Sequence, residues 1–133
     1  MIRKTMLLAI TASIFLSCQE SLEERAAREA REVTEAKCPM PVGSNLYLDS
    51  IVFDIPSLTQ TQYFRFIGNT DNDSMVVAMR DTDLKGALIQ ELKNTPTYKT
   101  LMKRGVSFRY VYRSTKERGK TFFDFTINKA DYE

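Results

Sequence analysis

Few side chains of this 133-residue sequence could carry out catalysis. The chain contains no histidine, two cysteines and five glycines. Ser-His and Cys-His catalysis and zinc sites that use histidine are therefore nearly excluded. Acid–base catalysis would need paired carboxylates, and Asp49 and Asp124 are candidates because both fall in predicted strands. Carboxylates at such positions more often form the polar side of a half-buried strand, so we predict a protein that is not an enzyme.

The first cysteine ends a segment with the pattern of an export signal. Arg3 and Lys4 precede an uncharged stretch over residues 5–17. This stretch is too short to span a bilayer as a helix, which takes about 20 residues. We therefore predict a secretory signal over residues 1–17. Leu16-Ser17-Cys18 resembles a bacterial lipobox, which implies that Cys18 starts the mature chain and carries fatty acids such as palmitate. An ordinary signal peptide with an incidental cysteine is the alternative.

A lipid on Cys18 would be the membrane contact of this protein. Several acyl chains on one residue anchor a protein far more firmly than one chain does. Gln19 follows Cys18, where an aspartate would resemble an inner-membrane retention signal, so we expect the outer membrane, in either leaflet. Cys38 would then lack a partner, and we predict a buried, small apolar side chain. An intermolecular, regulatory or catalytic Cys38 is the alternative, and without lipidation a Cys18–Cys38 disulfide could form.

Short motifs point to no metal ion or cofactor. Asp71, Asn72 and Asp73 hint at a calcium loop, but its sixth and twelfth positions hold Val76 and Thr82 in place of glycine and glutamate. We interpret this segment as a turn. The scattered glycines form no phosphate-binding loop.

One short motif points to a modification. Asp73-Ser74-Met75 and Asp49-Ser50-Ile51 resemble the Asp-Ser/Thr-aliphatic acceptor for O-glycosylation in Bacteroides-type periplasms. Ser74 is the better candidate because it falls in a predicted loop.

Charge is unevenly distributed along the chain. Residues 18–84 hold six cations and 12 anions, whereas residues 85–129 hold 11 cations and three anions. An acidic first part and a basic second part can attract each other within one fold. We therefore predict no nucleic-acid partner, which an exported protein would rarely meet.

The hydrophobic pattern predicts an α+β fold. Residues 20–37 have strong helix composition, with Ser21 and Glu24 as a capping box, and could pack lightly on the domain or form a stalk. Further elements are predicted as strands at 46–54, 62–68, 75–79, 106–113 and 122–127, the third being the weakest, and as helices at 84–92 and 96–104. We expect one antiparallel sheet of about four strands with helices packed on one face, preceded by the N-terminal helix.

This pattern divides the chain into three parts. They are the signal (1–17), the lipidated cysteine with its charged helix or stalk (18–41), and the α+β domain (42–133).

The sheet face without helices is the candidate partner face. Arginine beside aromatic side chains is favoured at interaction sites. The residues predicted on this face that fit the composition are Tyr63, Arg65, Arg109, Arg113 and Phe122. They could bind a protein or a glycan. An ordinary solvated face with cross-strand pairs is the alternative.

Several segments resemble small secreted proteins and lipoproteins of Bacteroides-type bacteria. The segments are Lys37-Cys38-Pro39-Met40-Pro41-Val42, Leu48-Asp49-Ser50, Tyr63-Phe64-Arg65-Phe66, Phe108-Arg109-Tyr110-Val111-Tyr112 and Phe123-Asp124-Phe125-Thr126. The most specific is the Cys-Pro-Met-x-Val segment, although Gly43 stands where members often have an acidic residue. The resemblance implies a small α+β domain with a curved antiparallel sheet. It implies no established activity, ligand or catalytic residue.

These observations predict a lipoprotein of the outer membrane or facing the periplasm that acts as a non-catalytic binding or accessory module. An inhibitor of a secreted hydrolase is one alternative. A small enzyme that uses carboxylates or Cys38 is another.

Overall fold

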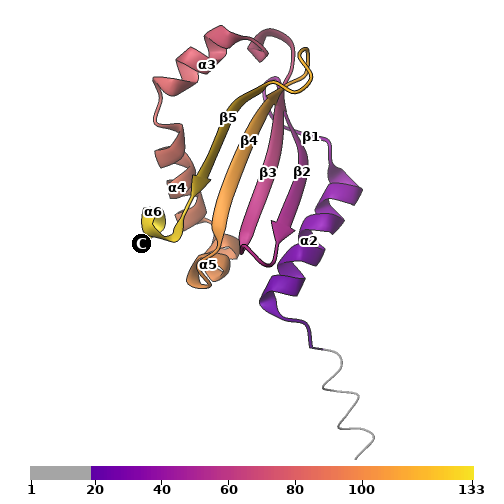
Figure 1. Cartoon of the computed structure of the whole chain (residues 1–133), viewed down its shortest axis with the longest axis vertical. Helices are drawn as coiled ribbons and strands as arrows, with labels where there is room; N and C mark the ends of the chain where they lie inside the picture. Colours follow the sequence, from indigo (N-terminus) through magenta and orange to yellow (C-terminus); the bar gives the residue numbers. More distant parts are fainter. Residues whose placement is uncertain (1–18) are drawn as a thin grey trace, which may run out of the picture.

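One mixed β-sheet with helices behind it forms the part of the chain that the computed structural model describes, residues 19–133 (Figure 1). The α+β class predicted from the sequence is confirmed. The predicted signal and Cys18 lie outside the described residues.

The elements begin and end at residues that favour these boundaries. The helices are α2 (Leu22–Lys37), α3 (Asp73–Arg80), α4 (Leu84–Asn94), α5 (Pro96–Lys103) and α6 (Lys129–Tyr132), with a 3₁₀ turn η1 (Gly68–Thr70). The strands are β1 (Met40–Gly43), β2 (Leu46–Asp54), β3 (Thr59–Phe66), β4 (Ser107–Ser114) and β5 (Thr121–Ile127). The side chains of Ser21 and Asp83 accept hydrogen bonds from the first turns of α2 and α4. Gly105 follows α5 with a φ of 79°, a conformation that favours glycine.

The strands lie in the order of the sequence, but one neighbouring pair is parallel. β1–β2, β2–β3 and β4–β5 are antiparallel, whereas β3 and β4 run parallel, with Tyr63 opposite Val111. The expectation of a purely antiparallel sheet was wrong at this pair. The physical reason is the connection: α3, α4 and α5 return the chain to the end of the sheet where β3 began.

The segment 75–79 was also predicted wrongly, since it lies in helix α3 rather than in a strand. Asn72 caps this helix by accepting a hydrogen bond from the backbone N–H of Met75 at 3.1 Å. Val76 is buried while Val77 is exposed. The short apolar run therefore fits one buried helix face as well as it fits a strand.

Alternate residues of the two central strands form the core. Phe64 and Phe66 of β3 and Phe108, Tyr110 and Tyr112 of β4 are buried on the face that the helices cover. Phe64 stacks on Tyr112 with ring centroids 4.7 Å apart. Leu92 of α4 and Leu101 of α5 pack on the same cluster, whose other members include Ala30 of α2. This places α2, α4 and α5 on one side of the sheet. The common side of α4 and α5 was predicted from the sequence, whereas the side of α2 was not.

Helix α2 packs on the domain and covers part of the β2 edge (Figure 1). The hydroxyl of Thr34 accepts a hydrogen bond from the N–H of Ile51 at 2.9 Å and donates one to its carbonyl at 3.0 Å. These two backbone groups would otherwise be free, because β1 pairs only with the first residues of β2. Of the two roles that the sequence left open for this helix, packing is the one observed.

Candidate partner-binding site

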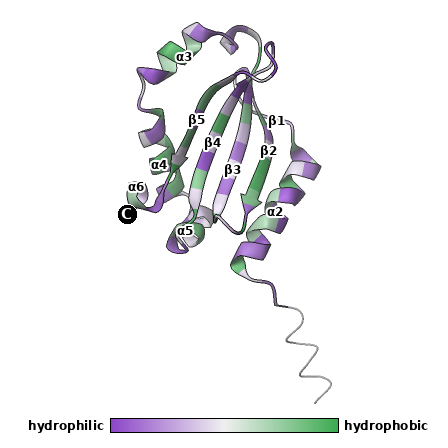
Figure 2. Ribbon diagram, viewed as in Figure 1, coloured by the Kyte–Doolittle hydropathy of each residue, from purple (hydrophilic) through white to green (hydrophobic). Residues whose placement is uncertain are grey.

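The helix-free face of the sheet brings together four of the five predicted partner residues. Tyr63 and Arg65 of β3 lie beside Val111 and Arg113 of β4, and Arg109 lies further along β4. In Figure 2, hydrophilic colours mark parts of β3 and β4, the two strands that carry these residues. Among the described residues, no helix crosses in front of it (Figure 1).

Most charges on this face are paired within it. The guanidinium of Arg65 lies 2.7 Å from the carboxylate of Asp49 and 5.0 Å from the ring centre of Tyr47. Arg109 donates two hydrogen bonds to Asp124, at 2.9 and 2.6 Å. Partly exposed pairs of this kind contribute roughly 0–1 kcal/mol each. They order the surface without adding much to stability.

Arg113 differs from the other two arginines. Its guanidinium lies 4.5 Å from the ring centre of Tyr63, and it forms no salt bridge with any residue in 19–133. An exposed guanidinium held over a ring keeps its donors available for a carboxylate or phosphate.

Phe122 does not belong to this face, so that part of the prediction was wrong. Its ring meets Phe66 edge-on, with centroids 5.8 Å apart, among the core residues. The register of β4 and β5 shifts between Tyr112 and Arg113, which leaves an extra residue in β5. A bulge of this kind breaks strict alternation, so Phe122 and Phe123 both contact the core.

The candidate catalytic carboxylates are not a pair. Asp49 and Asp124 belong to β2 and β5, with β3 and β4 between them, and each is bound to its own arginine. The hydrogen bond from Arg109 lowers the pKa of Asp124, although its partial burial opposes the shift. A carboxyl group held ionised in this way is poorly suited to donate a proton.

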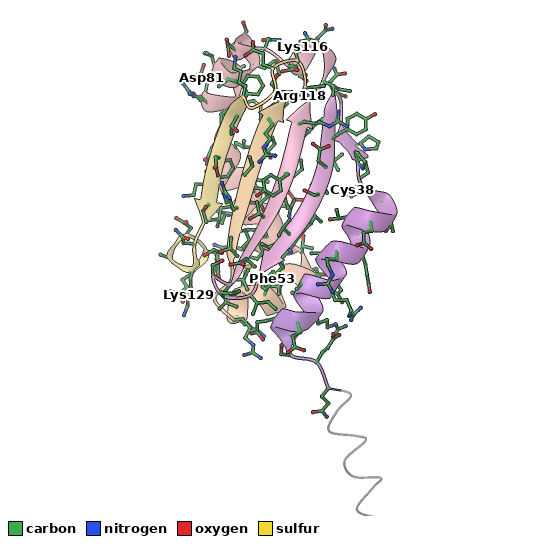
Figure 3. The ribbon with its side chains drawn as sticks, turned by 45° about the vertical axis from the view of Figure 1, so that its right-hand side comes forward. Cys38, Phe53, Asp81, Lys116, Arg118 and Lys129 are labelled. Atoms are coloured by element: carbon green, nitrogen blue, oxygen red, sulfur yellow. The ribbon has the colours of Figure 1, made fainter. Side chains whose placement is uncertain are left out.

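Cys38 lies at the C-terminal end of α2, next to β1 (Figure 3). It is half-buried and forms no disulfide with any described residue. Burial raises the pKa of its thiol, and the negative charge of Asp49 raises it further. The reactive form is the thiolate, so this position is unfavourable for a nucleophile.

The structure describes both the candidate glycosylation site, Ser74, and the segment 71–73 that hinted at a calcium loop. Ser74 is exposed in the first turn of α3 rather than in a loop. Asp71 is 5% exposed and accepts hydrogen bonds from the Ser114 hydroxyl and from the N–H groups of Thr115 and Lys116, at 2.6, 2.9 and 2.8 Å. Asp71 therefore holds the β4–β5 turn in place through hydrogen bonds. Figure 3 labels Lys116 and Arg118 in this turn. Within residues 19–133, no group of three potential ligand side chains could hold a metal ion.

Sequence reasoning missed a groove on the opposite side of the sheet. A hollow of about 440 Å³ lies between α2 and α5, with Ile51 and Gln60 at its floor. The α2 wall contributes Leu22, Arg25, Ala26, Glu29, Ala30 and Val33. Its apolar members, Leu22, Ala26, Ala30 and Val33, recur in the sequence at the spacing of one helix face, and this spacing would have been the only signal for the groove.

A second hollow of about 240 Å³ continues the first. Tyr98 lines both hollows. The sheet contributes Ile51 and Gln60 to the first hollow and Leu48, Gln62 and Phe64 to the second. These residues come from the same two strands, so we describe the two hollows together as the helix-side groove. α4 forms its other wall through Leu88, Glu91 and Leu92.

No helix within residues 19–133 has the length and apolar character to cross a membrane.

Comparison with known proteins shows the fold and the family. No curated protein matches the chain. A Pseudomonas aeruginosa protein whose description suggests secretion has a similar structure, with 12% identity and a TM-score of 0.63, over 86% of this chain and 100% of that one.

Two pilotins of type 2 secretion systems are also similar in structure. EpsS of Vibrio vulnificus has 18% identity and a TM-score of 0.58, covering 84% of this chain and 92% of its own. AspS of Vibrio cholerae has 18% identity and a TM-score of 0.54, covering 83% and 91%. At these identities the likeness concerns the fold alone. The sequence itself matches a family model over residues 21–123, and the chain belongs to that family, the domain of unknown function DUF8479.

Proposed function

We propose that this protein is a lipid-anchored, non-catalytic accessory protein of the bacterial cell envelope that binds a helix of a protein partner in the helix-side groove. The observation that carries the proposal is the hollow of about 440 Å³ between α2 and α5. A half-open hollow with two helical walls and a sheet floor suits a third helix, which would complete the layer.

The dimensions of the α2 wall fit such a guest. Leu22 and Val33 line its two ends, and at about 1.5 Å per residue a helix covers roughly 16 Å between these positions. This length corresponds to about three turns of a guest helix. Alanines at positions 26 and 30 allow its backbone to approach closely. Fold neighbours from secretion systems support an accessory role in the envelope.

The proposed anchor lies close to this groove in the sequence. Cys18 is four residues from Leu22, and an extended chain of that length spans at most about 14 Å. A lipid on Cys18 would therefore keep the groove near the membrane surface. Labelling the native host with palmitate tests the anchor: we expect label on the wild type and none on Cys18→Ala. Wild-type protein without label would refute it.

Crosslinking in the native envelope tests the groove. Ala26→Arg places a long charged side chain in the hollow, and we expect it to lose the crosslinked partner. Ala36→Arg is the matched control because Ala36 is exposed on the same helix, away from the groove. The proposal fails if both variants retain the partner.

The helix-free face is a second candidate site, favoured by the available guanidinium of Arg113. It would bind an acidic protein segment or an anionic glycan. Arg113→Glu should then abolish capture of the partner, whereas Arg118→Glu, an exposed change in the β4–β5 turn, should not. Loss of capture with Arg113→Glu but not with Ala26→Arg would assign binding to this face.

A further inference from the structure

Two buried tyrosines in the groove have side-chain hydroxyls without a hydrogen-bond partner among the described residues. Tyr110 and Tyr112 are each 4% exposed. Neither hydroxyl forms a hydrogen bond with another residue within 19–133. In that part of the chain, every side-chain nitrogen or oxygen that is inaccessible to solvent has a hydrogen-bond partner. Both hydroxyls must therefore reach accessible space, and both tyrosines line the second hollow. Tyr132 is a useful contrast, because its buried hydroxyl donates to the carbonyls of Met102 and Val106.

Such hydroxyls favour a polar guest. A buried hydroxyl without a partner is costly, so native structures usually supply one from water or a ligand. An entirely apolar helix would remove water from Tyr110 and Tyr112 and supply no partner in its place.

The charge around this hollow indicates which polar group fits. Among the described residues that line the second hollow, Glu91 of α4 is the one that carries a charge. Burial raises the pKa of Tyr112 to about 12, and the negative charge of Glu91 adds to this increase. The same charge acts on Tyr98 and Tyr110. The hollow is therefore electronegative, which disfavours a carboxylate or phosphate.

We infer that the second hollow receives a cationic side chain, an amine or a guanidinium, from the buried face of the partner helix. Its N–H groups would donate to the hydroxyl oxygens of Tyr110 and Tyr112 and to the carboxylate of Glu91. The remaining walls, which include Leu48, Leu88 and Leu92, suit the methylene stem of lysine or arginine. This inference rests on the proposed function and specifies the partner: an amphipathic helix with one basic residue within its apolar stripe.

Three small probes that differ only in their head group test the inference. Hexylammonium, hexanol and hexanoate would be titrated into the mature protein, with binding followed by NMR of ring-labelled tyrosine. We expect hexylammonium to shift the Tyr110 and Tyr112 signals saturably. It should bind about tenfold more tightly than hexanol, because its ammonium group is attracted by one nearby negative charge, that of Glu91, in a partly solvated site. Hexanoate should bind more weakly than hexanol. Equal binding of hexanoate and hexylammonium, or no saturable binding of any probe, would overturn the inference.

Variants separate this result from the fate of the proposed function. Glu91→Gln should reduce hexylammonium binding to the level of hexanol, whereas Glu35→Gln, on the exposed side of α2, should not. The double variant Tyr110→Phe/Tyr112→Phe should fold as well as the wild type and show a smaller preference for hexylammonium, because Glu91 remains but the two hydroxyl acceptors are gone. If Ala26→Arg abolishes partner capture while Glu91→Gln leaves probe selectivity unchanged, the proposed function stands and this inference is wrong.

Discussion

Replacing Asp71 with alanine should destabilise the protein strongly, although this residue is charged and does not belong to the hydrophobic core. Its carboxylate is buried and accepts three hydrogen bonds from consecutive residues of the β4–β5 turn. A hydrogen bond to a charged group contributes about 1.5–3 kcal/mol, and such bonds in one cluster are not additive. We expect Asp71→Ala to lower the free energy of unfolding by about 2–4 kcal/mol.

Urea denaturation at pH 7 measures this change. Asp81→Ala is the matched control, since Asp81 is exposed and only its backbone N–H bonds to α3. The control should change the free energy of unfolding by less than about 0.5 kcal/mol. If the two variants are equally stable, Asp71 does not fasten the turn.

The pH dependence gives a second test. Burial alone would raise the pKa of Asp71, but the hydrogen bonds from Ser114, Lys116 and Thr115 outweigh it, so the folded-state pKa lies below the ordinary value. A depressed pKa contributes stability that is fully present above the unfolded pKa of about 3.9 and is lost as the pH falls through the folded value. The gap between wild type and Asp71→Ala should therefore stay constant from pH 7 to about 5 and narrow in stronger acid. A gap that widens in acid would refute the reasoning.

Further predictions concern other contacts described above. Tyr132→Phe should lower the free energy of unfolding by about 1 kcal/mol because two carbonyls lose their donor, whereas Tyr110→Phe should be nearly neutral; equal effects in thermal unfolding would contradict this. Thr34→Val should cost about 1–2 kcal/mol in urea denaturation, since the N–H and carbonyl of Ile51 lose their partner, and Thr34→Ser should retain most of the stability. The raised thiol pKa predicts that Cys38 reacts with iodoacetamide at pH 8 more slowly than a free thiol does, and a rate equal to that of the free thiol would contradict the shift.

Long, regular patterns predicted their elements well. The predicted strand 46–54 coincides with β2, and the strands at 106–113 and 122–127 match β4 and β5 within one residue at most ends. Ser21, Asp83 and Gly105 end or begin helices as their types suggest. These signals are local, so tertiary packing did not alter them.

The errors have non-local causes. The alternation of apolar and polar residues shows that one face of a strand is buried, but it does not show in which direction the strand runs. For β4, the direction follows from the three-helix connection that precedes it. The bulge that turns Phe122 into the core depends on how β5 pairs with β4, which its own sequence does not show. Likewise, the groove arises between α2 and α5, which are far apart in the chain. The sequence indicates Asp71 only as a potential metal ligand, because its hydrogen-bond partners lie more than 40 residues away.

The parallel contact between β3 and β4 has a consequence for how the protein would fold during the export that we propose. The β2–β3 and β4–β5 hairpins are joined by short turns and can form early, but pairing them requires closure of a connection of about 40 residues. In that process, the aromatic side of the first hairpin would stay uncovered and prone to aggregation until β4 and the intervening helices had followed it. A chain exported with its N-terminus first would therefore need protection, from a chaperone or from rapid translocation, until its last third had emerged.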